Sequence, residues 1–327
     1  MSRPSLVALA LSVAACPGPK PAPDVDLPAP GAGQGFQLVA GPFDVASGTE
    51  VQRCYFFAAP DGVTWVNRVQ TGLNPGSHHL NLFRVRTVVN LSGKPGDMIE
   101  NGECFNSSNW ADWPLVTNQQ DSTAGRNVAD WTYPTGVAQR FAPGELLMLQ
   151  IHYVDASTQK TPGRGKGVVN FFSVDAGAVT AELGTMNATN QNIEVCPGDT
   201  DRHYSATCFF NASSTGAAPV TIVAANGHFH SRGTDFTMSV EDAQGTVAPA
   251  PFYENLSWNE PVFERGLNVV VPTGGGVQWV CHYGMGAGAC GDPAKSCCCT
   301  FGGHVETQEH CNAFVYYYPK TGDVTCF

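Results

Sequence analysis

The chain has 327 residues, of which 43% are hydrophobic and only 14% are charged, and its formal net charge is −11 at pH 7. A chain with so few basic residues lacks the positive surface that binds phosphate backbones, so we expect no nucleic-acid partner. The 36 glycines and 23 prolines favour many short strands joined by tight turns over long helices. The length suits two domains of about 150 residues each.

The N-terminus predicts export. An apolar run over residues 6–15 follows Arg3, and Val13-Ala14-Ala15-Cys16 resembles a bacterial lipobox. The run is too short to span a bilayer, which takes about 20 helical residues, so it reads as a targeting segment. We expect residues 1–16 to be a lipoprotein signal peptide with lipid on Cys16, which would anchor the exported product to the membrane on its periplasmic or cell-surface side. A general secretory signal cleaved nearby is the alternative.

The next segment and the cysteines agree with an exported protein. Residues 17–35 are rich in proline and nearly free of large apolar side chains, which predicts an extended tether. The chain holds 12 cysteines, a number typical of an oxidising compartment.

From residue 36 onward the pattern predicts an all-β protein. No amphipathic helix of any length is evident, and short apolar-alternating runs recur between turn signals, which is typical of β-sandwiches. These runs cover residues 51–58, 79–89, 146–154, 168–174, 220–225, 236–240, 267–271, 277–282 and 313–318. We expect an N-terminal domain over residues 36–174 and a C-terminal domain over residues 175–327, with the seam in the Ala/Gly/Asn-rich segment 175–192.

Six of the nine histidines stand where metal ligands could converge. Neighbouring residues of a regular strand point to opposite faces, so the first pair could share one metal only at a strand end or bulge, which Pro75-Gly76 makes plausible. An i, i+2 pair projects both imidazoles from one face of a strand. Nitrogen-only sites suit copper or zinc, although a single strand histidine is more often a hydrogen-bonded core or surface residue. The six are His78, His79, His152, His228, His230 and His310.

The order and context of these histidines resemble the copper type II, ascorbate-dependent monooxygenases, the family of peptidylglycine alpha-hydroxylating monooxygenase and dopamine beta-monooxygenase. Four segments carry the resemblance: SHHLNLF, LQIHYVD, GHFHSRG and QEHCNAFVYYYP. It covers the chain from about residue 36 and implies two tandem jelly-roll β-sandwich domains that face each other across a wet cleft.

The resemblance also implies a reaction. One copper ion would be held by His78, His79 and His152 in the N-terminal domain, and a second by His228, His230 and the residue at position 310 in the C-terminal domain. Ascorbate or another one-electron reductant would reduce both ions. One atom of dioxygen would then enter an unactivated C–H bond of a small-molecule substrate, with no catalytic residue beyond the copper ligands.

The same resemblance pairs six of the cysteines. It implies disulfides Cys54–Cys104, Cys208–Cys326 and Cys281–Cys311. Five cysteines besides Cys16 then have no assigned partner: Cys196, Cys290, Cys297, Cys298 and Cys299. Residues 288–299 look like an insertion, which is either a loop stapled by disulfides or a Cys-rich copper or zinc clip.

One departure bears on activity. At position 310 the family has a methionine, a soft thioether ligand that favours copper(I), whereas this chain has an imidazole, which also suits copper(II) or zinc. Met285 is a possible substitute sulfur ligand. The alternative function is therefore a non-catalytic, copper-binding or copper-sequestering surface lipoprotein that keeps the monooxygenase fold.

Other departures bear on the substrate. Asn226 and Phe314 stand where the peptide-amidating enzymes bind a carboxylate with arginine and tyrosine, so we expect no peptidylglycine substrate. Asn312 is retained, and Arg232 could recruit an acid from another direction. A third hypothesis, a zinc hydrolase, would need a carboxylate base such as Asp155 or Asp235.

Overall fold

The computed structural model describes residues 23–86, 93–100, 113–120, 127–155, 162–210, 218–285, 290 and 298–327. The expected signal peptide with Cys16, and Cys104, lie outside this range. Regular structure in the described residues is β-strand except for one short 3-10 helix at Ala176–Ala178, which confirms the all-β class. None of the helices described is long and apolar enough to cross a membrane.

The N-terminal half contains two sheets. The first joins, in spatial order, β1 (Gly35–Val45), β10 (Gly163–Val174), β3 (Thr64–Leu73), β8 (Val137–Phe141) and β11 (Ala181–Glu182), and β7 (Val128–Thr132) also pairs with β3. The second joins β5 (Met98–Glu100), β2 (Glu50–Ala58), β9 (Leu146–Val154), β4 (Ser77–Arg84) and β6 (Leu115–Gln119).

The C-terminal half repeats this plan. One sheet joins β18 (Glu264–Val271), β15 (Val220–His228), β22 (Asn312–Tyr318), β12 (Gly184–Thr189) and β23 (Val324–Cys326). Another joins β14 (Arg202–Phe209), β19 (Gly276–Tyr283), β16 (Gly233–Glu241) and β17 (Tyr253–Asn255). A small third sheet joins β13 (Glu194–Val195), β20 (Cys299–Phe301) and β21 (Gln308–Glu309).

Both halves place their principal strands in jelly-roll order. Numbered first to eighth along the chain, the principal strands of the first half are β1, β2, β3, β4, β6, β7 with β8, β9 and β10. Those of the second half are β12, β14, β15, β16, β17, β18, β19 and β22. In each half the first strand lies beside the eighth, the eighth beside the third and the third beside the sixth. The other sheet runs second, seventh, fourth, fifth. This double Greek-key order is the jelly roll.

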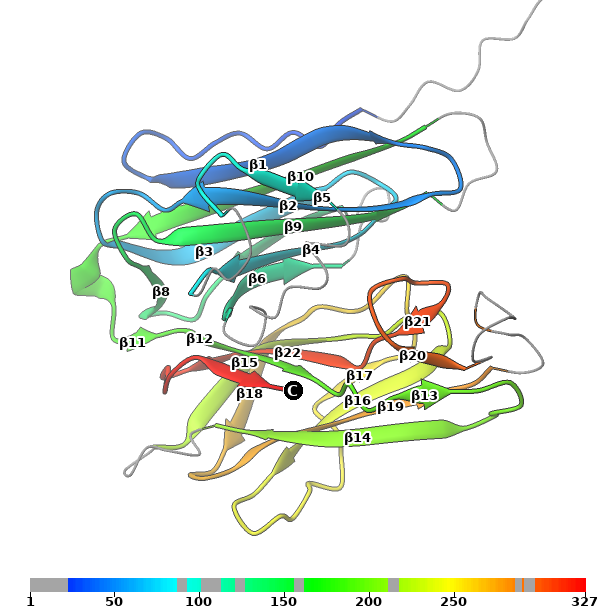
Figure 1. Cartoon of the computed structure of the whole chain (residues 1–327). Coiled ribbons are helices and arrows are strands. Elements are labelled where there is room, and N and C mark those ends of the chain that lie inside the picture. The colour runs from blue at the N-terminus through cyan, green and yellow to red at the C-terminus, as the bar shows by residue number, and fades with distance from the viewer. Residues whose placement is uncertain are drawn as a thin grey trace, which may run out of the picture.

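Each half has an apolar core, and the first core extends to Phe314 and Tyr316 of the C-terminal half. Phe56, Leu82 and Phe171 are among the buried side chains of the first core, and Phe236 and Trp279 are among those of the second. Leu183 packs into the first core and Met186 into the second, so the chain passes between the halves within residues 175–192. The two halves lie one above the other in Figure 1.

The sheets that face each other between the halves are buried on both sides. Strand β9 is buried at seven of its nine positions. In an antiparallel sheet with one face in solvent, every second residue of such a strand would be exposed instead. Leu149 and Ile151 point into the first core, so the alternate residues Gln150 and His152 face the C-terminal half. The polar residues that carry the site are therefore held between the two halves.

A polar clamp and aromatic rings join the halves. Asn118 of β6 donates through its side chain to Asn226 of β15 at 2.7 Å. The Tyr316 hydroxyl donates to Asn118 Oδ1 at 2.6 Å and accepts the Asn118 backbone N–H at 3.0 Å. The ring of Trp131 packs edge-on against Tyr316 with centroids 5.2 Å apart. All four side chains are buried, so these hydrogen bonds form away from water and fix the register of one half on the other.

Four disulfides join described cysteines, which is typical of an exported protein. Two are the pairs that the resemblance implies, Cys208–Cys326 and Cys281–Cys311. Two more, Cys196–Cys298 and Cys290–Cys299, staple the insertion, so these four cysteines offer no thiolates for a Cys-rich metal clip. Cys54 is also disulfide-bonded, while its expected partner Cys104 and the remaining Cys297 lie outside the described residues.

Candidate metal centre between the halves

The six singled-out histidines meet in one buried cluster. Within the N-terminal half the ring centroids of His79 and His152 lie 4.9 Å apart, because these residues pair directly across β4 and β9. Within the C-terminal half, His230 lies 4.3 Å from His310, and His228 lies 5.2 Å from His230.

The two groups also touch each other across the halves. His78 lies 4.9 Å from His228 and 5.5 Å from His230, and His79 lies 5.2 Å from His228. The resemblance implies two metal sites separated by a wet cleft. This expectation differs from the structure, in which the facing sheets pack directly and the imidazoles form one continuous cluster.

A bulge brings the neighbouring pair to one site. The pairing of β4 with β9 shifts register between Ser77 and His79, and Gly76 has a φ of 91°, a conformation that favours glycine. The extra residue in β4 re-aims His78, so that both adjacent imidazoles approach His152, whose ring lies 5.0 Å from that of His78. The expected irregularity after Pro75-Gly76 is therefore present.

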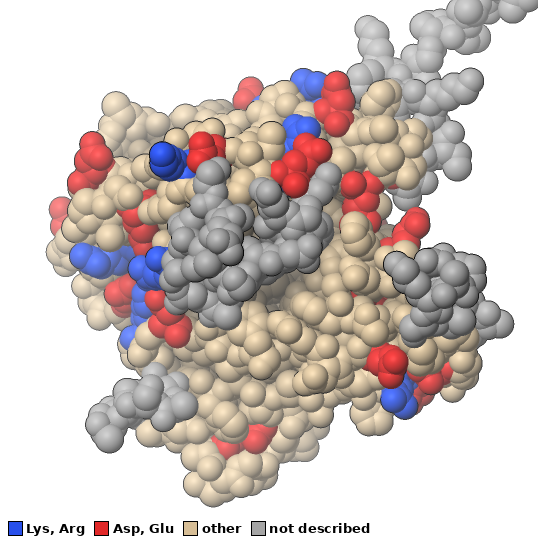
Figure 2. All heavy atoms as spheres, in the orientation of Figure 1, with Lys and Arg blue, Asp and Glu red and all other residues tan. Residues whose placement is uncertain are grey.

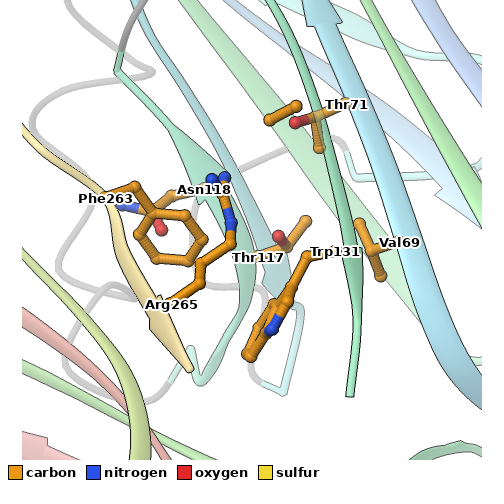
Figure 3. Close-up of a pocket in the computed structure, with 8 residues that line it drawn as sticks. Val69, Thr71, Thr117, Asn118, Trp131, Phe263 and Arg265 are labelled. Atoms are coloured by element: carbon orange, nitrogen blue, oxygen red, sulfur yellow. The ribbon is translucent and has the colours of Figure 1, made fainter. Parts of the chain in front are cut away.

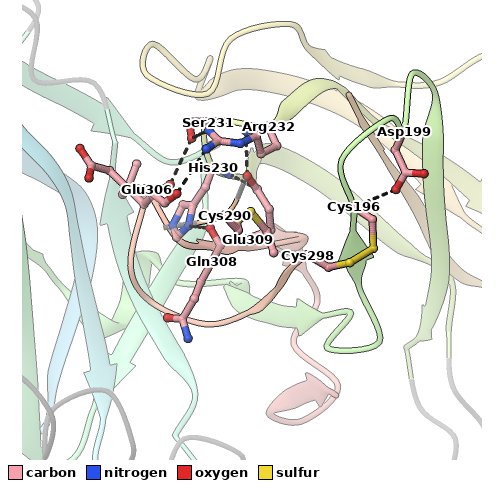
Figure 4. The surroundings of a disulfide bond; sticks show 12 residues. Cys196, Asp199, His230, Ser231, Arg232, Cys290, Cys298, Glu306, Gln308 and Glu309 are labelled. Carbon is pink, nitrogen blue, oxygen red and sulfur yellow. Dashed lines mark hydrogen bonds between the residues drawn. A yellow bond between two sulfur atoms is a disulfide. The ribbon is translucent and has the colours of Figure 1, made fainter. Parts of the chain in front are cut away.

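A buried carboxylate shapes the turn that carries the i, i+2 pair. Strand β15 ends at His228, and the chain turns where the Gly233 N–H donates to the His230 carbonyl. Glu309 accepts the backbone N–H groups of His230 at 3.0 Å and Arg232 at 2.7 Å (Figure 4). Burial raises the pKa of Glu309 to about 7, and these two N–H donors oppose that rise.

The insertion braces the same region. Strand β20 holds Cys299 and pairs in parallel with β21, which carries Glu309. The disulfide Cys196–Cys298 joins the start of this segment to the loop after β13 (Figure 4). The ring of Phe301 then packs on His310 at 5.1 Å. The strand that follows the insertion therefore supports the backbone just before His310 and packs on its ring.

Hydrogen bonds orient three of the rings. Nε2 of His152 lies 2.7 Å from a carboxylate oxygen of Glu50, and Nε2 of His79 lies 3.1 Å from the Gln150 side-chain oxygen. Nδ1 of His230 lies 3.0 Å from the Gln308 carbonyl. Partners of this kind fix the ring and its tautomer, so that the other nitrogen is left to bind a metal.

The free ring nitrogens fit a metal. Several ring nitrogens are buried and have no hydrogen-bond partner among the described residues, a state that costs free energy unless a ligand satisfies them. They are Nε2 of His78, Nδ1 of His79, both nitrogens of His228, Nε2 of His230 and Nδ1 of His310. Burial, reinforced by the neighbouring imidazoles, holds the pKa of His78, His79, His228 and His310 well below its usual value. Burial lowers that of His230 to about 4. Neutral imidazole is the form that binds metals.

The grouping of ligands differs from the expected two triads. Among the described residues, ring nitrogens lie within 4.8 Å of one another in His78, His79 and His152, as expected, but the second such group is His78, His228 and His230. His78 thus stands between the two sets. His310 joins the cluster through ring contacts with His228 at 5.1 Å and with His230.

The expected substrate residues are engaged with the protein. Asn312 pairs with His228 across β22 and β15, and its side-chain oxygen accepts the Thr189 hydroxyl. Arg232 donates to the Ser231 hydroxyl at 2.6 Å and to the Glu306 carbonyl at 3.4 Å (Figure 4).

The remaining sequence candidates lie elsewhere in hydrogen-bonded structure. Met285 packs in the second core and donates its N–H to the Asp199 carbonyl. Asp155 accepts the Gly163 N–H, and Asp235 pairs with His282 across β16 and β19. The carboxylate that contacts a clustered imidazole is Glu50 instead.

Sequence reasoning missed both Glu50 and Glu309. Glu50 lies 102 residues before its partner His152 in the chain, so only the pairing of β2 with β9 brings them together. Glu309 directly precedes His310 in the segment QEHCNAFVYYYP, and that position was the one feature of the sequence that could have identified it.

A smaller group of possible ligands lies on the outer sheet of the C-terminal half. His203 and His282 pair across β14 and β19, and Asp201 accepts from His282 Nδ1 at 3.0 Å. The ligand atoms of these three residues lie within 4.8 Å of one another. Because they are partly or fully exposed, they make a useful control for the buried cluster.

The charged surface is sparse. On the face shown in Figure 2, Lys and Arg side chains are few and mostly lie beside Asp or Glu, with broad uncharged areas between them. Five arginines of the N-terminal half pair with carboxylates, as in Arg68 with Asp130 and Arg84 with Glu145. The positive charge of these five side chains is therefore neutralised locally by carboxylates.

No protein-family model and no curated protein matches the chain. Among solved structures, the tandem CBM22 modules of Paenibacillus barcinonensis Xyn10C show 10% identity and a TM-score of 0.23, over 90% of this chain and 86% of that chain. A triple jelly-roll protein of an archaeal virus shows 8% identity and a TM-score of 0.23, and the match spans 90% of this chain but only 62% of the viral chain. Likenesses this weak carry no argument about function.

Proposed function

We propose that the chain is a copper-dependent monooxygenase that uses ascorbate or another one-electron reductant to hydroxylate a C–H bond of a small molecule. One observation carries the proposal: six imidazoles from both halves converge in a buried cluster, and five of them present nitrogens that no group of the described residues satisfies. Copper, when bound there, would supply one-electron redox chemistry and the activation of dioxygen.

The donor set favours copper. Imidazole nitrogen is a borderline ligand, and copper(II) binds such sites more tightly than the other divalent first-row metals. A hydrolytic zinc site would need a carboxylate free to act as a base, but Glu50, which contacts a ring of the cluster, is held by His152 and contacts His304 at 3.6 Å.

Different residues would hold the metal, orient its ligands and exclude water. His78, His79 and His152 would hold one ion, and His228, His230 and His310 the other. Glu50, Gln150 and the Gln308 carbonyl would keep the rings in the ligating tautomer. Burial of both facing sheets would exclude bulk water from the reaction.

The alternative is a copper-binding or copper-sequestering protein without oxygenase activity. Its specific support is His310, whose ring lies 4.3 Å from that of His230, so that a third imidazole rather than a thioether would complete the second group. Three imidazoles stabilise copper(II) more than two imidazoles and one thioether do, which would slow reduction.

Metal content tests the proposal first. Copper titration followed by native mass spectrometry should show two ions in the cluster of the wild type, and the double variant His228→Ala/His230→Ala should lose at least one of them. The matched control is His203→Ala/His282→Ala, which removes two histidines from the outer sheet and should leave the cluster loaded. Equal copper content in all three proteins would contradict a copper cluster.

Activity separates the two candidate functions. Ascorbate-dependent oxygen consumption by the copper-loaded wild type, raised by a substrate and absent from His228→Ala/His230→Ala, would support the monooxygenase. Full copper loading with no such oxygen consumption over a range of small-molecule substrates would support sequestration.

We also propose that the exported protein is anchored by lipid on Cys16, as its lipobox-like segment indicates. Stable anchoring takes at least two acyl chains or a second membrane signal. Cys16→Ser should abolish both lipid attachment and cleavage before residue 16. A variant that stays in the membrane and is processed at the same site would contradict lipid attachment.

A further inference from the structure

The contact between the halves beside the polar clamp is nearly filled by side chains. Its pocket lies among Trp131, Phe263 and Arg265 (Figure 3) and has room for about one water molecule. The guanidinium of Arg265 covers the Phe263 ring, with its central carbon 4.1 Å from the ring centroid. The outer sheet of the C-terminal half, in contrast, presents possible ligands to solvent.

Two histidines lie side by side on this outer sheet. His203 and His282 pair directly across β14 and β19, and their ring centroids lie 5.5 Å apart. Residues opposite each other in an antiparallel pair point to the same face, with Cβ atoms about 4.5–5.5 Å apart. Cys281 and Tyr283, on either side of His282, are buried in the second core, so the two imidazoles lie on the solvent face.

A carboxylate joins the pair. Asp201 comes two residues before His203, and its Oδ1 accepts a hydrogen bond from Nδ1 of His282 at 3.0 Å. Arg202, between them in the chain, donates instead to the Tyr204 hydroxyl at 3.1 Å. The ligand atoms of the two histidines and Asp201 lie within 4.8 Å of one another. Two imidazoles and a carboxylate form the donor set of open zinc sites, in which water takes the fourth position.

The distances need little adjustment to fit an ion. Neighbouring ligands on a tetrahedral zinc ion, with bonds of about 2.0–2.1 Å, lie about 3.3 Å apart. Nδ1 of His282 and Oδ1 of Asp201 are already close to this separation. An ion between them replaces the shared proton, which Nε2 of His282 then carries, so the ring stays neutral. His203 is exposed, so its ring can turn to bring the third ligand atom closer.

A second carboxylate extends the row. Asp235 of β16 pairs with His282 from the side opposite to His203. Its Oδ1 is buried and has no hydrogen-bond partner among the described residues. Such an oxygen costs free energy unless a cation or a water bound to one satisfies it. Carboxylates therefore flank His282 on both sides, and their charge favours a cation at this place.

The strand that carries the central ligand is held firmly. Strand β19 lies between β14 and β16 in the sheet. Cys281, directly before His282, forms a disulfide with Cys311 on the inner side of the sheet. A ligand on a rigid strand needs less ordering when an ion binds than a ligand on a loop does.

We propose that Asp201, His203 and His282 form a solvent-exposed site for a borderline divalent cation, zinc or copper(II), with water in the open position. Imidazole suits both ions. The site goes beyond the proposed function, because its ligands are separate from the six clustered histidines.

The test is protection of the two imidazoles from chemical modification. Diethyl pyrocarbonate reacts with ring nitrogens that carry neither a proton nor a metal, and peptide mass spectrometry locates the product. The full-length protein is freed of metal by a chelator, and zinc, copper(II) or magnesium is then added at one concentration. Zinc or copper(II) should slow the modification of His203 and His282 at least tenfold relative to magnesium, which prefers oxygen ligands.

Variants locate the ligands. His203→Ala and Asp201→Asn should each raise the zinc concentration that half-protects His282 at least tenfold. The matched control is Asp44→Asn on β1, since the Asp44 and Asp201 side chains are both 75% exposed. This control should be protected as the wild type is. The double variant His228→Ala/His230→Ala should also keep the protection, because the buried cluster is not part of this site.

Two results would overturn the assignment. One is equal modification of both histidines in zinc, copper(II) and magnesium. The other is an unchanged zinc dependence in both His203→Ala and Asp201→Asn, which would mean that His282 binds the ion without them. Loading of the buried cluster, counted by native mass spectrometry on the same samples, keeps a failure of this site distinct from a failure of the copper cluster.

Discussion

Acid should destabilise the metal-free protein through its buried imidazoles, and His230 allows the effect to be calculated. An unfolded histidine titrates near 6.5, whereas burial lowers the pKa of His230 in the folded chain to about 4. Between these values the unfolded chain holds the extra proton, so stability is complete above the unfolded pKa and falls as pH decreases. From about pH 7.5 to about pH 5, this single group should cost about 2 kcal/mol.

The variant His230→Gln isolates that contribution. Glutamine stays neutral over this range and still offers an N–H to the Gln308 carbonyl, which His230 contacts at 3.0 Å. Glu309 contributes with the opposite sign, because its raised pKa of about 7 lets the folded chain keep a proton that the unfolded chain loses. Both proteins carry Glu309, so its contribution largely cancels in the comparison.

The assay is urea unfolding in the presence of a metal chelator at several pH values. The wild type should lose about 2 kcal/mol more than His230→Gln between about pH 7.5 and about pH 5. The exposed-residue control His203→Gln should follow the wild type. Parallel curves for the wild type and His230→Gln would refute the reasoning, because they would mean that His230 is not buried in a neutral state.

Further perturbations test the disulfide, the clamp and the ligands. Cys281→Ala/Cys311→Ala opens a loop with a sequence separation of 30 and should lower the free energy of unfolding by about 3–4 kcal/mol in the chain-entropy model; an unchanged urea midpoint would contradict this. Tyr316→Phe removes the hydroxyl of the clamp and should cost about 1–3 kcal/mol; an equally stable variant would show that the halves do not depend on it. Glu50→Gln should weaken copper binding about 10–100-fold, and unchanged affinity in a competition titration would rule out its orienting role. His310→Met should add a sulfur neighbour to copper(I) in X-ray absorption spectra, and a spectrum identical to that of the wild type would mean that position 310 does not ligate.

Much of the fold followed from local patterns. Alternation, glycine and proline predict a chain of short strands, and the i, i+2 spacing of His228 and His230 predicts a shared side, because these relations depend only on residues close together in the chain. The sequence likewise predicted an irregularity near His78 from Pro75-Gly76, and the register shift is there.

Which carboxylates contact the histidine cluster depends on strand pairing between distant segments, and no local sequence pattern encodes that pairing. Glu50 reaches His152 across a pair of strands joined by 102 residues of chain. The two carboxylate oxygens of Glu309 hold a turn 77 and 79 residues earlier. Neither contact has a signature in spacing or composition.

By itself, the sequence determined that the protein is all-β and disulfide-bonded and which six histidines belong together. Only the tertiary structure decided that they form one cluster rather than two separated groups and that His78 stands between the groups. The physical reason is that alternation determines which face of a strand a side chain occupies. How closely two sheets approach depends on the packing of all the side chains between them.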